Sequence, residues 1–261
     1  PVGAPSPRAR IALARGEKEA FQICLRPGDQ PMINTTLQIT DLTSADGTAH
    51  IPAKDIVLNN VDYVPVRIPS HYEGPTGRWP DPLPPHKPFV ADAHAVSTIW
   101  VTLYAAPGLP GGLYRGVWPI IAEGEAPRNL QVEVQVYDFD LPRAPRLKTD
   151  FGFWDEAALR GSKMFGGRAD KAALCKAYLE NALDHRVTLR DPLEFPGISG
   201  DFTGELAKRL PRLKSALTDG ATQIAVPADL LNAPEKLKQA NDFVVKEHLQ
   251  GRVFVPISYE P

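Results

Sequence analysis

Aromatic and acidic side chains follow several short apolar stretches in the second half of the chain. Trp154 and Asp155 come after one stretch, Arg190 and Asp191 after the next, and Asp229 after a third. An indole ring stacks on the C–H face of a pyranose, and carboxylates accept hydrogen bonds from hydroxyl groups or transfer protons in glycoside cleavage. These residue types favour a carbohydrate ligand. The competing interpretation is structural, because tryptophan often packs beneath loops and aspartate often caps helices.

The last ten residues, RVFVPISYEP, place a carboxylate directly after an apolar run. Chain ends usually carry polar, loosely packed residues, whereas this one has the pattern of a strand that stops at Glu260. Barrel enzymes place their catalytic groups at the carboxyl ends of strands. We therefore expect Glu260 to be a catalytic carboxyl group, in a chain that has been truncated just after a fourth strand.

Other chemistries have little support in the residues. The six histidines form no HExxH motif and no metal-type pair with cysteine, Ser258 lies in no GxSxG motif, and Cys175 falls inside a predicted helix. No glycine-rich phosphate loop follows a predicted strand. We therefore expect no metal and no cofactor.

Charge and hydropathy limit the partners. The formal net charge of −2 is too balanced for a surface that binds nucleic acid. No apolar run approaches the roughly 20 residues that cross a bilayer, so we expect no membrane span. Cys24 and Cys175 lie far apart in apolar contexts and are expected to be free thiols. The sequence leaves the oligomeric state open.

The elements that must position these candidate residues alternate between strand and helix. We expect strands at 148–153, 187–190, 222–226 and 253–258, and helices at 170–185, 205–218 and 234–250. This βαβαβαβ order builds a parallel sheet, either an open doubly wound sheet or half of a (β/α)8 TIM barrel. The absence of a glycine-rich loop disfavours the nucleotide-binding sheet, so we expect 148–261 to be the first half of a barrel.

The first part of the chain has a different character. Of the 27 prolines, 20 precede Arg146, and this density disfavours long helices. Residues 130–136, LQVEVQV, alternate apolar and polar side chains, which is the period of a strand with one buried face. Similar runs between turn residues predict an antiparallel β-sandwich over 1–141, followed by a linker at 142–147.

A proline-rich segment, HYEGPTGRWPDPLPPHK at 71–87, interrupts the predicted strands. It has too many prolines for a central strand and too many aromatic residues for a flexible linker. We expect an ordered loop that packs over an edge of the sandwich or against the next domain. The alternative is that Trp79 or Tyr72 extends from it toward a ligand.

Five stretches, in this order, resemble the glycoside hydrolase family 123 type and its relatives of unknown function. They are GEKEAFQICL (16–25), WPDPLPP (79–85), PGLPGGLYRG (107–116), DFDLPRAPRLKTDFGF (138–153) and YLENALDHRVT (178–188), followed by the terminal YEP. The resemblance runs through nearly the whole chain. It implies an N-terminal β-sandwich joined to a (β/α)8 barrel, in a bacterial enzyme that is secreted or periplasmic.

The resemblance also implies a mechanism. Family members are retaining β-N-acetylgalactosaminidases in which the 2-acetamido oxygen of the sugar attacks the anomeric carbon. A glutamate protonates the leaving oxygen, and an adjacent aspartate steadies the acetamido group. Glu260 matches the general acid/base, Pro261 matches the proline that follows it, and Tyr259 stands where the family has the aspartate.

Tyr259 is the main departure from the family pattern. A neutral phenol makes hydrogen bonds but supplies no negative charge to a developing oxazolinium ion, and losing such a partner costs on the order of a hundredfold in rate. Three hypotheses follow. The first is a glycosidase for β-linked N-acetylhexosamine with Glu260 as acid, inactive as this fragment. The second is a sugar-binding or scaffolding relative without hydrolysis, and the third is an adhesion module in the first part of the chain.

Overall fold

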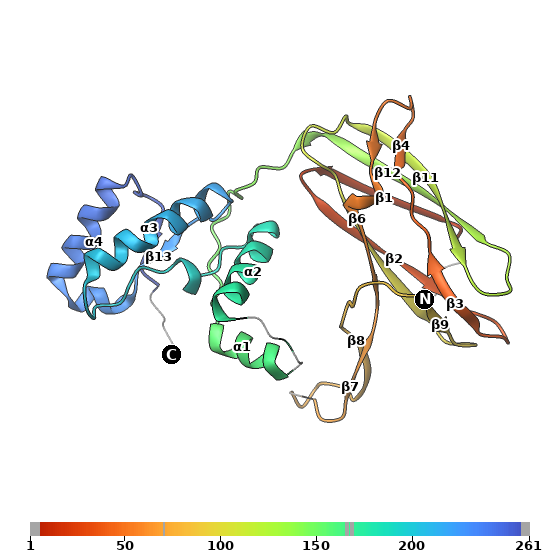
Figure 1. Cartoon of the computed structure of the whole chain (residues 1–261), viewed down its shortest axis with the longest axis horizontal. Helices are drawn as coiled ribbons and strands as arrows, with labels where there is room; N and C mark the ends of the chain where they lie inside the picture. The colour runs from red at the N-terminus through yellow and green to blue at the C-terminus, as the bar shows by residue number, and fades with distance from the viewer. Residues whose placement is uncertain (1–5, 70, 165–166, 168–169, 257–261) are drawn as a thin grey trace. The chain divides into compact units, whose positions relative to one another are not determined.

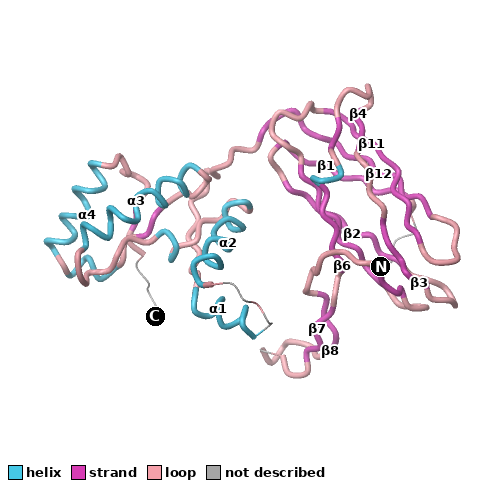
Figure 2. Tube along the Cα trace, viewed as in Figure 1, coloured by secondary structure: helices cyan, strands magenta, loops and turns pink. Residues whose placement is uncertain are grey.

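The computed structural model describes residues 6–69, 71–164, 167 and 170–256. The chain divides between Leu141 and Pro142 into two compact units, and each is described by itself. Figures 1 and 2 show that strands dominate the first unit and helices the second. In the described residues, β1 to β12 all belong to the first unit and α1 to α4 all belong to the second.

The larger sheet of the first unit follows the order β1–β12–β11–β3–β9, with β4 and β5 attached beside β11. Its strands are β1 (Arg8–Arg15), β3 (Met32–Leu37), β4 (Leu42–Ser44), β5 (His50–Ile51), β9 (Phe89–Ala91), β11 (Gly112–Ile121) and β12 (Arg128–Asp140). β12 pairs antiparallel with β11 but parallel with β1, with Arg8 opposite Gln131 and Leu13 opposite Val136. The sheet is therefore mixed.

Two smaller sheets complete the first unit. β10 (Ser97–Tyr104) lies between β2 (Lys18–Leu25) and β6 (Ile56–Asn60), antiparallel to both. β7 (Tyr63–Val66) and β8 (Gly77–Pro80) form a separate hairpin. A short 3₁₀ helix, Ala53–Asp55, precedes β6.

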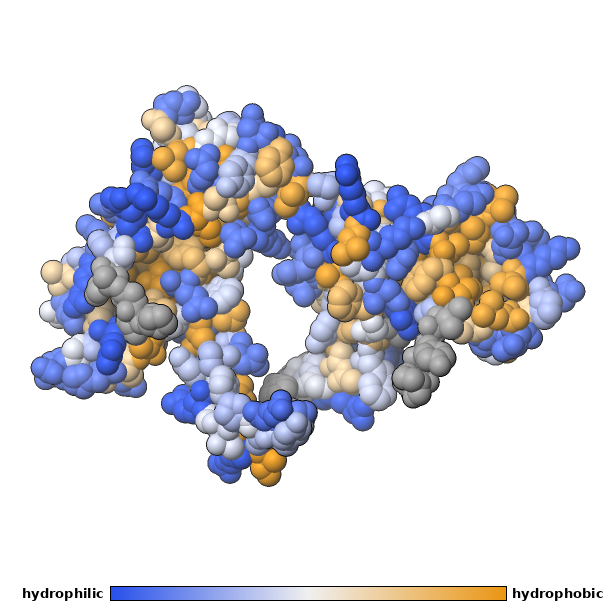
Figure 3. Space-filling model, turned by 180° about the vertical axis from the view of Figure 1, so that it is seen from behind, coloured by the Kyte–Doolittle hydropathy of each residue, from blue (hydrophilic) through white to orange (hydrophobic). Residues whose placement is uncertain are grey.

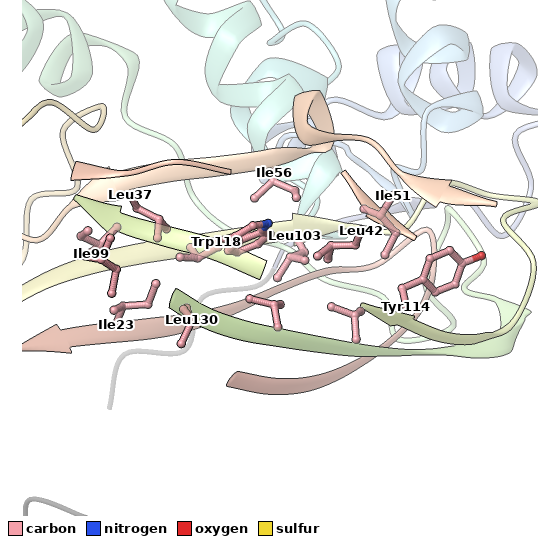
Figure 4. Packing of buried hydrophobic residues seen from close by; sticks show 14 of the residues in the cluster. Ile23, Leu37, Leu42, Ile51, Ile56, Ile99, Leu103, Tyr114, Trp118 and Leu130 are labelled. Atoms are coloured by element: carbon pink, nitrogen blue, oxygen red, sulfur yellow. The ribbon is translucent and has the colours of Figure 1, made fainter. Parts of the chain in front are cut away.

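One hydrophobic core receives side chains from both β10 and the larger sheet. The apolar residues of the alternating run in β12 all point inward, and Val132 and Val134 are fully buried. Trp118 of β11 lies in the middle of the cluster drawn in Figure 4, and its indole N–H donates to the Thr40 carbonyl oxygen at 3.1 Å. The one-sided strand predicted for 130–136 is confirmed, because every second side chain enters this core.

The second unit contains four α-helices in its described residues. They are α1 (Asp155–Met164), α2 (Lys171–Asp184), α3 (Phe202–Thr218) and α4 (Pro234–Lys246). The helices predicted around α2, α3 and α4 are confirmed, whereas α1 was not predicted. Asp170 and Asp201 cap α2 and α3, since their carboxylates accept hydrogen bonds from the amides of Ala173 and Gly204.

The extended segments of the second unit pair only briefly. β13 (Ile224–Ala225) and β14 (Val253–Phe254) form a parallel pair of two residues each. Residues 148–153 and 187–190 share a single parallel bridge, between Phe151 and Leu189. Two short 3₁₀ helices, Asp191–Leu193 and Ala228–Asn232, follow the second and third segments.

The predicted fold class, an antiparallel β-sandwich followed by half of a (β/α)8 TIM barrel, is wrong. The larger sheet of the first unit is mixed and curls around its core, because the N-terminal strand joins β12 in parallel. In the described part of the second unit, a two-residue pair and one bridge replace four parallel strands. The expected strand KTDFGF, 148–153, holds too few apolar and β-branched residues to build a ladder.

Apolar residues also remain on the surface of both units, as the orange regions of Figure 3 show. In the second unit, Phe151, Trp154 and Tyr178 are all exposed. Its buried residues form two clusters. A large one is centred on α3, β13 and α4, and a small one holds Phe153, Ala182 and Leu189.

Candidate functional site

Three threonines hold the extended segments of the second unit together. The Thr188 amide donates to Thr149 Oγ1 at 2.8 Å, and the Thr149 amide donates to Thr222 Oγ1 at 3.2 Å. The hydroxyl groups of Thr188 and Thr222 lie 3.0 Å apart, and both residues are buried. Side-chain hydroxyls therefore satisfy backbone groups that a longer β-ladder would have paired.

The carboxyl ends of these segments lie at one end of the unit. Phe151 bridges Leu189 in parallel, and β13 runs parallel to β14. The chain after Arg190 returns to the end of β13, because the Phe195 amide donates to the Ala225 carbonyl oxygen at 2.9 Å. Residues 226 and 255, which follow β13 and β14, therefore lie at the same end of this parallel pair.

An ion pair occupies this end. Arg190 Nε lies 3.1 Å from both carboxylate oxygens of Asp150, and Arg190 Nη2 donates to Asp150 Oδ2 as well. The Arg190 amide also donates to the Phe151 carbonyl oxygen at 2.8 Å. The forked geometry holds both side chains, and the remaining lone pairs of the carboxylate can accept hydrogen bonds from a ligand hydroxyl.

Trp154 lies at the start of α1 with 72% of its surface exposed. The Arg160 guanidinium is 5.9 Å from the centroid of the indole ring, within the range of a cation–π contact. The Trp154 carbonyl oxygen accepts from the Ala158 amide at 3.0 Å, which fixes the backbone at this point as the first turn of the helix. An exposed indole on a fixed backbone is suited to stacking on a flat apolar face.

Asp155 takes part in a second charged group. Lys171 Nζ lies 3.0 Å from Asp155 Oδ2 and 2.7 Å from Glu156 Oε1. These hydrogen bonds, the one to Glu156 first, raise the pKa of the Lys171 ammonium above its ordinary value. The three side chains tie the start of α1 to the start of α2.

A cavity of about 740 Å³ lies between α2 and α3 and reaches this group. Its walls include Phe153, Asp155, Cys175, Leu179 and Arg212. Burial, and next the neighbouring Arg209, lower the pKa of the Arg212 guanidinium below the usual arginine value. The cavity is large enough for a small ligand and has a mixed apolar and charged lining.

The sequence-predicted residues have different outcomes. Trp154 and Asp155 are neighbours at the start of α1, and Asp155 lines the cavity. Arg190 binds Asp150, and Asp191 is the first residue of a 3₁₀ helix. Tyr259 and Glu260 lie outside the described residues.

Asp150 and Lys171 were missed by sequence reasoning. Asp150 lies within a predicted strand and not after one, and its partner Arg190 is 40 residues away. Lys171 lies in the first turn of α2, where a cation opposes the helix dipole. That unfavourable position was a usable signal, because it calls for compensating carboxylates nearby.

Two further searches concern the described residues only. No group of three or more histidine, cysteine, aspartate or glutamate side chains among them is arranged to hold a metal ion. None of the helices that the structure describes has the length and apolar character needed to cross a membrane.

No protein-family model matches the sequence, and no curated protein matches it. Among solved structures, the chain is similar to a family 123 glycoside hydrolase from Clostridium perfringens that was studied for glycolipid glycan hydrolysis, with a TM-score of 0.70 and 12% identity. The match covers 99% of this chain and 55% of that one, so this chain spans about half the length of that enzyme. The likeness is one of fold.

A GH5 xyloglucanase from Bacteroides ovatus also matches, over 94% of this chain and 52% of that one at 10% identity. Its TM-score of 0.23 is too low to bear on the fold or the site.

Proposed function

We propose that this chain is part of a glycoside hydrolase whose sugar site lies at the carboxyl ends of the extended segments of the second unit. The observation that carries the proposal is the exposed indole of Trp154, four residues along the chain from Asp150, whose carboxylate pairs with Arg190. A stacking surface together with fixed hydrogen-bonding groups is the usual composition of a carbohydrate site. The likeness in fold to a family 123 glycoside hydrolase supports the same class.

Each group has a role in this proposal. Trp154 stacks on the apolar face of a sugar ring, and the Asp150–Arg190 pair accepts and donates hydrogen bonds to ring hydroxyls. Asp155, the neighbour of Trp154 along the chain, provides a further carboxylate in this proposal. Glu260, six residues after the end of β14, acts as general acid/base in this proposal.

The proposed substrate is a β-linked N-acetylhexosamine, resembling N-acetylgalactosamine, at the end of a glycan. In the proposed reaction, the acetamido oxygen attacks the anomeric carbon, the glycosidic bond breaks, and the Glu260 carboxyl proton passes to the leaving oxygen. Water then opens the oxazolinium ring with Glu260 as base, so that the anomeric configuration is retained. Tyr259 hydrogen-bonds the acetamido group in the place of an aspartate.

Hydrolysis of nitrophenyl glycosides tests the proposal with the protein at its natural length. β-N-Acetylgalactosaminide, β-N-acetylglucosaminide and β-galactoside are the three substrates. We expect release from an acetamido sugar, and a loss on the order of a hundredfold or more in kcat/KM for Glu260→Gln. Glu235→Gln, an exposed glutamate at the start of α4, is the matched control and should leave kcat/KM unchanged.

Two variants separate binding from chemistry. Trp154→Ala should raise KM more than it lowers kcat, because stacking holds substrate and transition state alike. Tyr259→Asp should raise kcat on acetamido sugars by restoring the negative charge.

The second candidate is a sugar-binding relative without hydrolysis, which the neutral Tyr259 favours. It predicts glycan binding that Trp154→Ala weakens, with no turnover on any sugar. Turnover that Glu260→Gln abolishes excludes this candidate. Turnover equal in wild type and Glu260→Gln would contradict the hydrolase proposal.

A further inference from the structure

The first unit has a cavity of its own, with a volume of about 460 Å³. It lies where the end of β6, the start of β7, strand β9 and the turn before β10 meet. The polar and aromatic side chains in its lining include Asn60, Asp62, Tyr63, Arg78, Phe89, Asp92 and Ser97. We propose that this cavity is a binding site for neutral oligosaccharides, separate from the site in the second unit and independent of the hydrolase proposal.

The base of the cavity is held by the proline-rich segment. The Asn60 amide donates to the Pro84 carbonyl oxygen at 3.0 Å, and the Asp62 amide donates to the Pro82 carbonyl oxygen at 2.9 Å. Asn60 Oδ1 also lies 2.5 Å from His86 Nδ1. Prolines lack an amide hydrogen but keep a carbonyl oxygen, so Pro82 and Pro84 take part in this pairing as acceptors only. The groups in the base are therefore positioned before a ligand arrives.

Aromatic and apolar groups supply the surface for a sugar ring. Tyr63 lines the cavity, with the Arg78 guanidinium 5.4 Å from its ring centroid. Phe89 lines it as well, and its ring packs edge-on against His86 at 6.2 Å. Val90 and Val96, also in the lining, are both exposed. A tyrosine with apolar neighbours suits the C–H face of a pyranose.

The polar groups of the lining are available for a ligand. Among the described residues, the Asp92 carboxylate and the Arg78 guanidinium make no ion pair, and the hydroxyls of Tyr63 and Ser97 make no hydrogen bond. Asp62 accepts only from the adjacent Tyr63 amide, at 2.7 Å. Carboxylates and a guanidinium bind paired hydroxyls of a sugar through two hydrogen bonds at once.

Charge decides the class of sugar. The lining holds two carboxylates, Asp62 and Asp92, and one guanidinium, Arg78, so an anionic sugar or a polyphosphate would be repelled. An apolar ligand would leave these charged groups without partners in the complex. Neutral sugars match both the charge and the alternation of apolar and polar lining, and the volume lies within the range of roughly 300–1,000 Å³ for ligand sites.

NMR titration of the Glu260→Gln protein with neutral oligosaccharides tests the proposal, and this variant keeps the ligand intact if the protein is the hydrolase proposed above. The probes are cello-, malto-, xylo- and chito-oligosaccharides. We expect one series to shift the amide signals of Tyr63, Ser97 and Thr98. Shifts confined to residues 150–155 and 190 would show binding at the second-unit site alone and would overturn the inference.

Two variants and two controls locate the binding. Tyr63→Ala and Asp92→Ala should each weaken binding at least about tenfold, the equivalent of one good hydrogen bond or stacking contact. Tyr137→Ala and Asp138→Ala, which alter exposed residues of β12 in the same unit, should leave the affinity unchanged. Asp92 is an exposed turn residue, so Asp92→Ala should fold normally. This variant still tests the proposal if Tyr63→Ala fails to fold. Failure of every probe to bind, or equal affinity in wild type and both cavity variants, contradicts the proposal whether or not the protein hydrolyses glycosides.

Discussion

The two units build their sheets by different means. In the first, β12 pairs with β1 on one side and β11 on the other, over most of the length of each strand. In the second, the extended segments share a two-residue pair, one bridge and a set of threonine hydroxyls. Backbone hydrogen bonds are largely independent of side-chain identity, whereas the threonine bonds depend on three particular residues.

This difference affects how each unit responds to substitution. The stability of the first unit depends on how completely its core is filled, because its large buried side chains form one continuous cluster. The second unit has two separate clusters with a cavity beside them. Each hydrogen bond between its segments should therefore contribute a larger share of the unit's stability. We expect core truncation to have the larger effect in the first unit and hydroxyl removal to have the larger effect in the second.

The largest expected effect is that of Trp118→Ala. Trp118 is fully buried, and removing its ring leaves a large void and an unpaired Thr40 carbonyl oxygen. We expect the free energy of unfolding of the first unit to fall by about 3–5 kcal/mol. Hydrogen exchange followed by mass spectrometry measures this separately for peptides of each unit.

Trp79→Ala is the matched control in the same unit. Trp79 is 45% exposed, and its indole N–H donates to the Pro75 carbonyl oxygen at 3.3 Å. We expect a loss of about 1 kcal/mol or less. Equal losses for the two tryptophan variants would show that the core described around Trp118 does not determine stability.

Thr222→Val should have the next largest effect, in the second unit. Valine keeps the shape but removes the acceptor of the Thr149 amide and the partner of the Thr188 hydroxyl. The Thr149 amide would lose its acceptor, while the Thr188 hydroxyl would keep only the bond from the residue 222 amide, and we expect a cost of about 1–3 kcal/mol. Hydrogen exchange of peptides from 149–151 and 188–190 reports the loss.

Thr98→Val tests the same change in the first unit. Thr98 is buried, but among the described residues its hydroxyl has one polar partner, Cys24 Sγ at 3.8 Å, while its backbone pairs within the β2–β10–β6 sheet. We expect a loss of a few tenths of a kcal/mol, because a sulfur contact at this distance is weak. If Thr98→Val costs as much as Thr222→Val, the contrast between the units does not hold.

The sequence predicts local structure in this protein better than it predicts sheet architecture. The strand period of 130–136 and the helix expected at 205–218 depend on neighbours along the chain, and both are confirmed. The parallel partner of Arg8 is Gln131, 123 residues away, and no local pattern indicates that pairing. The helix α1 was missed because DEAALRGSKM has few large apolar residues to set a helical period.

The same limit applies to the candidate site. Residue type made Trp154 a candidate for stacking on a sugar, and the structure adds that its indole is exposed. The Asp150–Arg190 pair needed the structure, because it depends on two segments lying side by side. The prediction that functional polar residues follow the strands included Arg190 but gave it no partner. It omitted Asp150 because that residue lies within the expected strand, before Phe151.

Asp201→Ala should have a smaller effect and concerns a helix end. The Asp201 carboxylate accepts the Gly204 amide at 3.0 Å and caps α3. We expect a loss of about 1 kcal/mol in the second unit, by chemical denaturation. Asp242→Ala, at an exposed position inside α4, is the control and should cost nothing, since alanine is the better helix former. An equal loss in both variants would mean that the cap contributes little.

The smallest expected effect is a pH dependence in the first unit. Burial lowers the pKa of His86 below the ordinary value of 6.5. The Leu37 amide points at His86 Nε2 at 3.5 Å, so the neutral ring donates from Nδ1 to Asn60 and keeps Nε2 as an acceptor. Protonation would place a second N–H group opposite that amide.

The direction in which stability changes with pH follows from the coupling of proton binding to folding. Because the folded pKa is below the unfolded one, the unfolded chain binds more protons between the two values, and stability rises with pH in that interval. The contribution is fully present above pH 6.5 and is lost as the pH falls through the folded pKa. We expect the unfolding free energy of the first unit to decline in this window, and the decline to be weaker in His86→Gln. An imidazole titration by NMR with a midpoint for His86 at or above 6.5 would contradict the burial of this ring, and with it the rigid attachment of the proline-rich segment to β6.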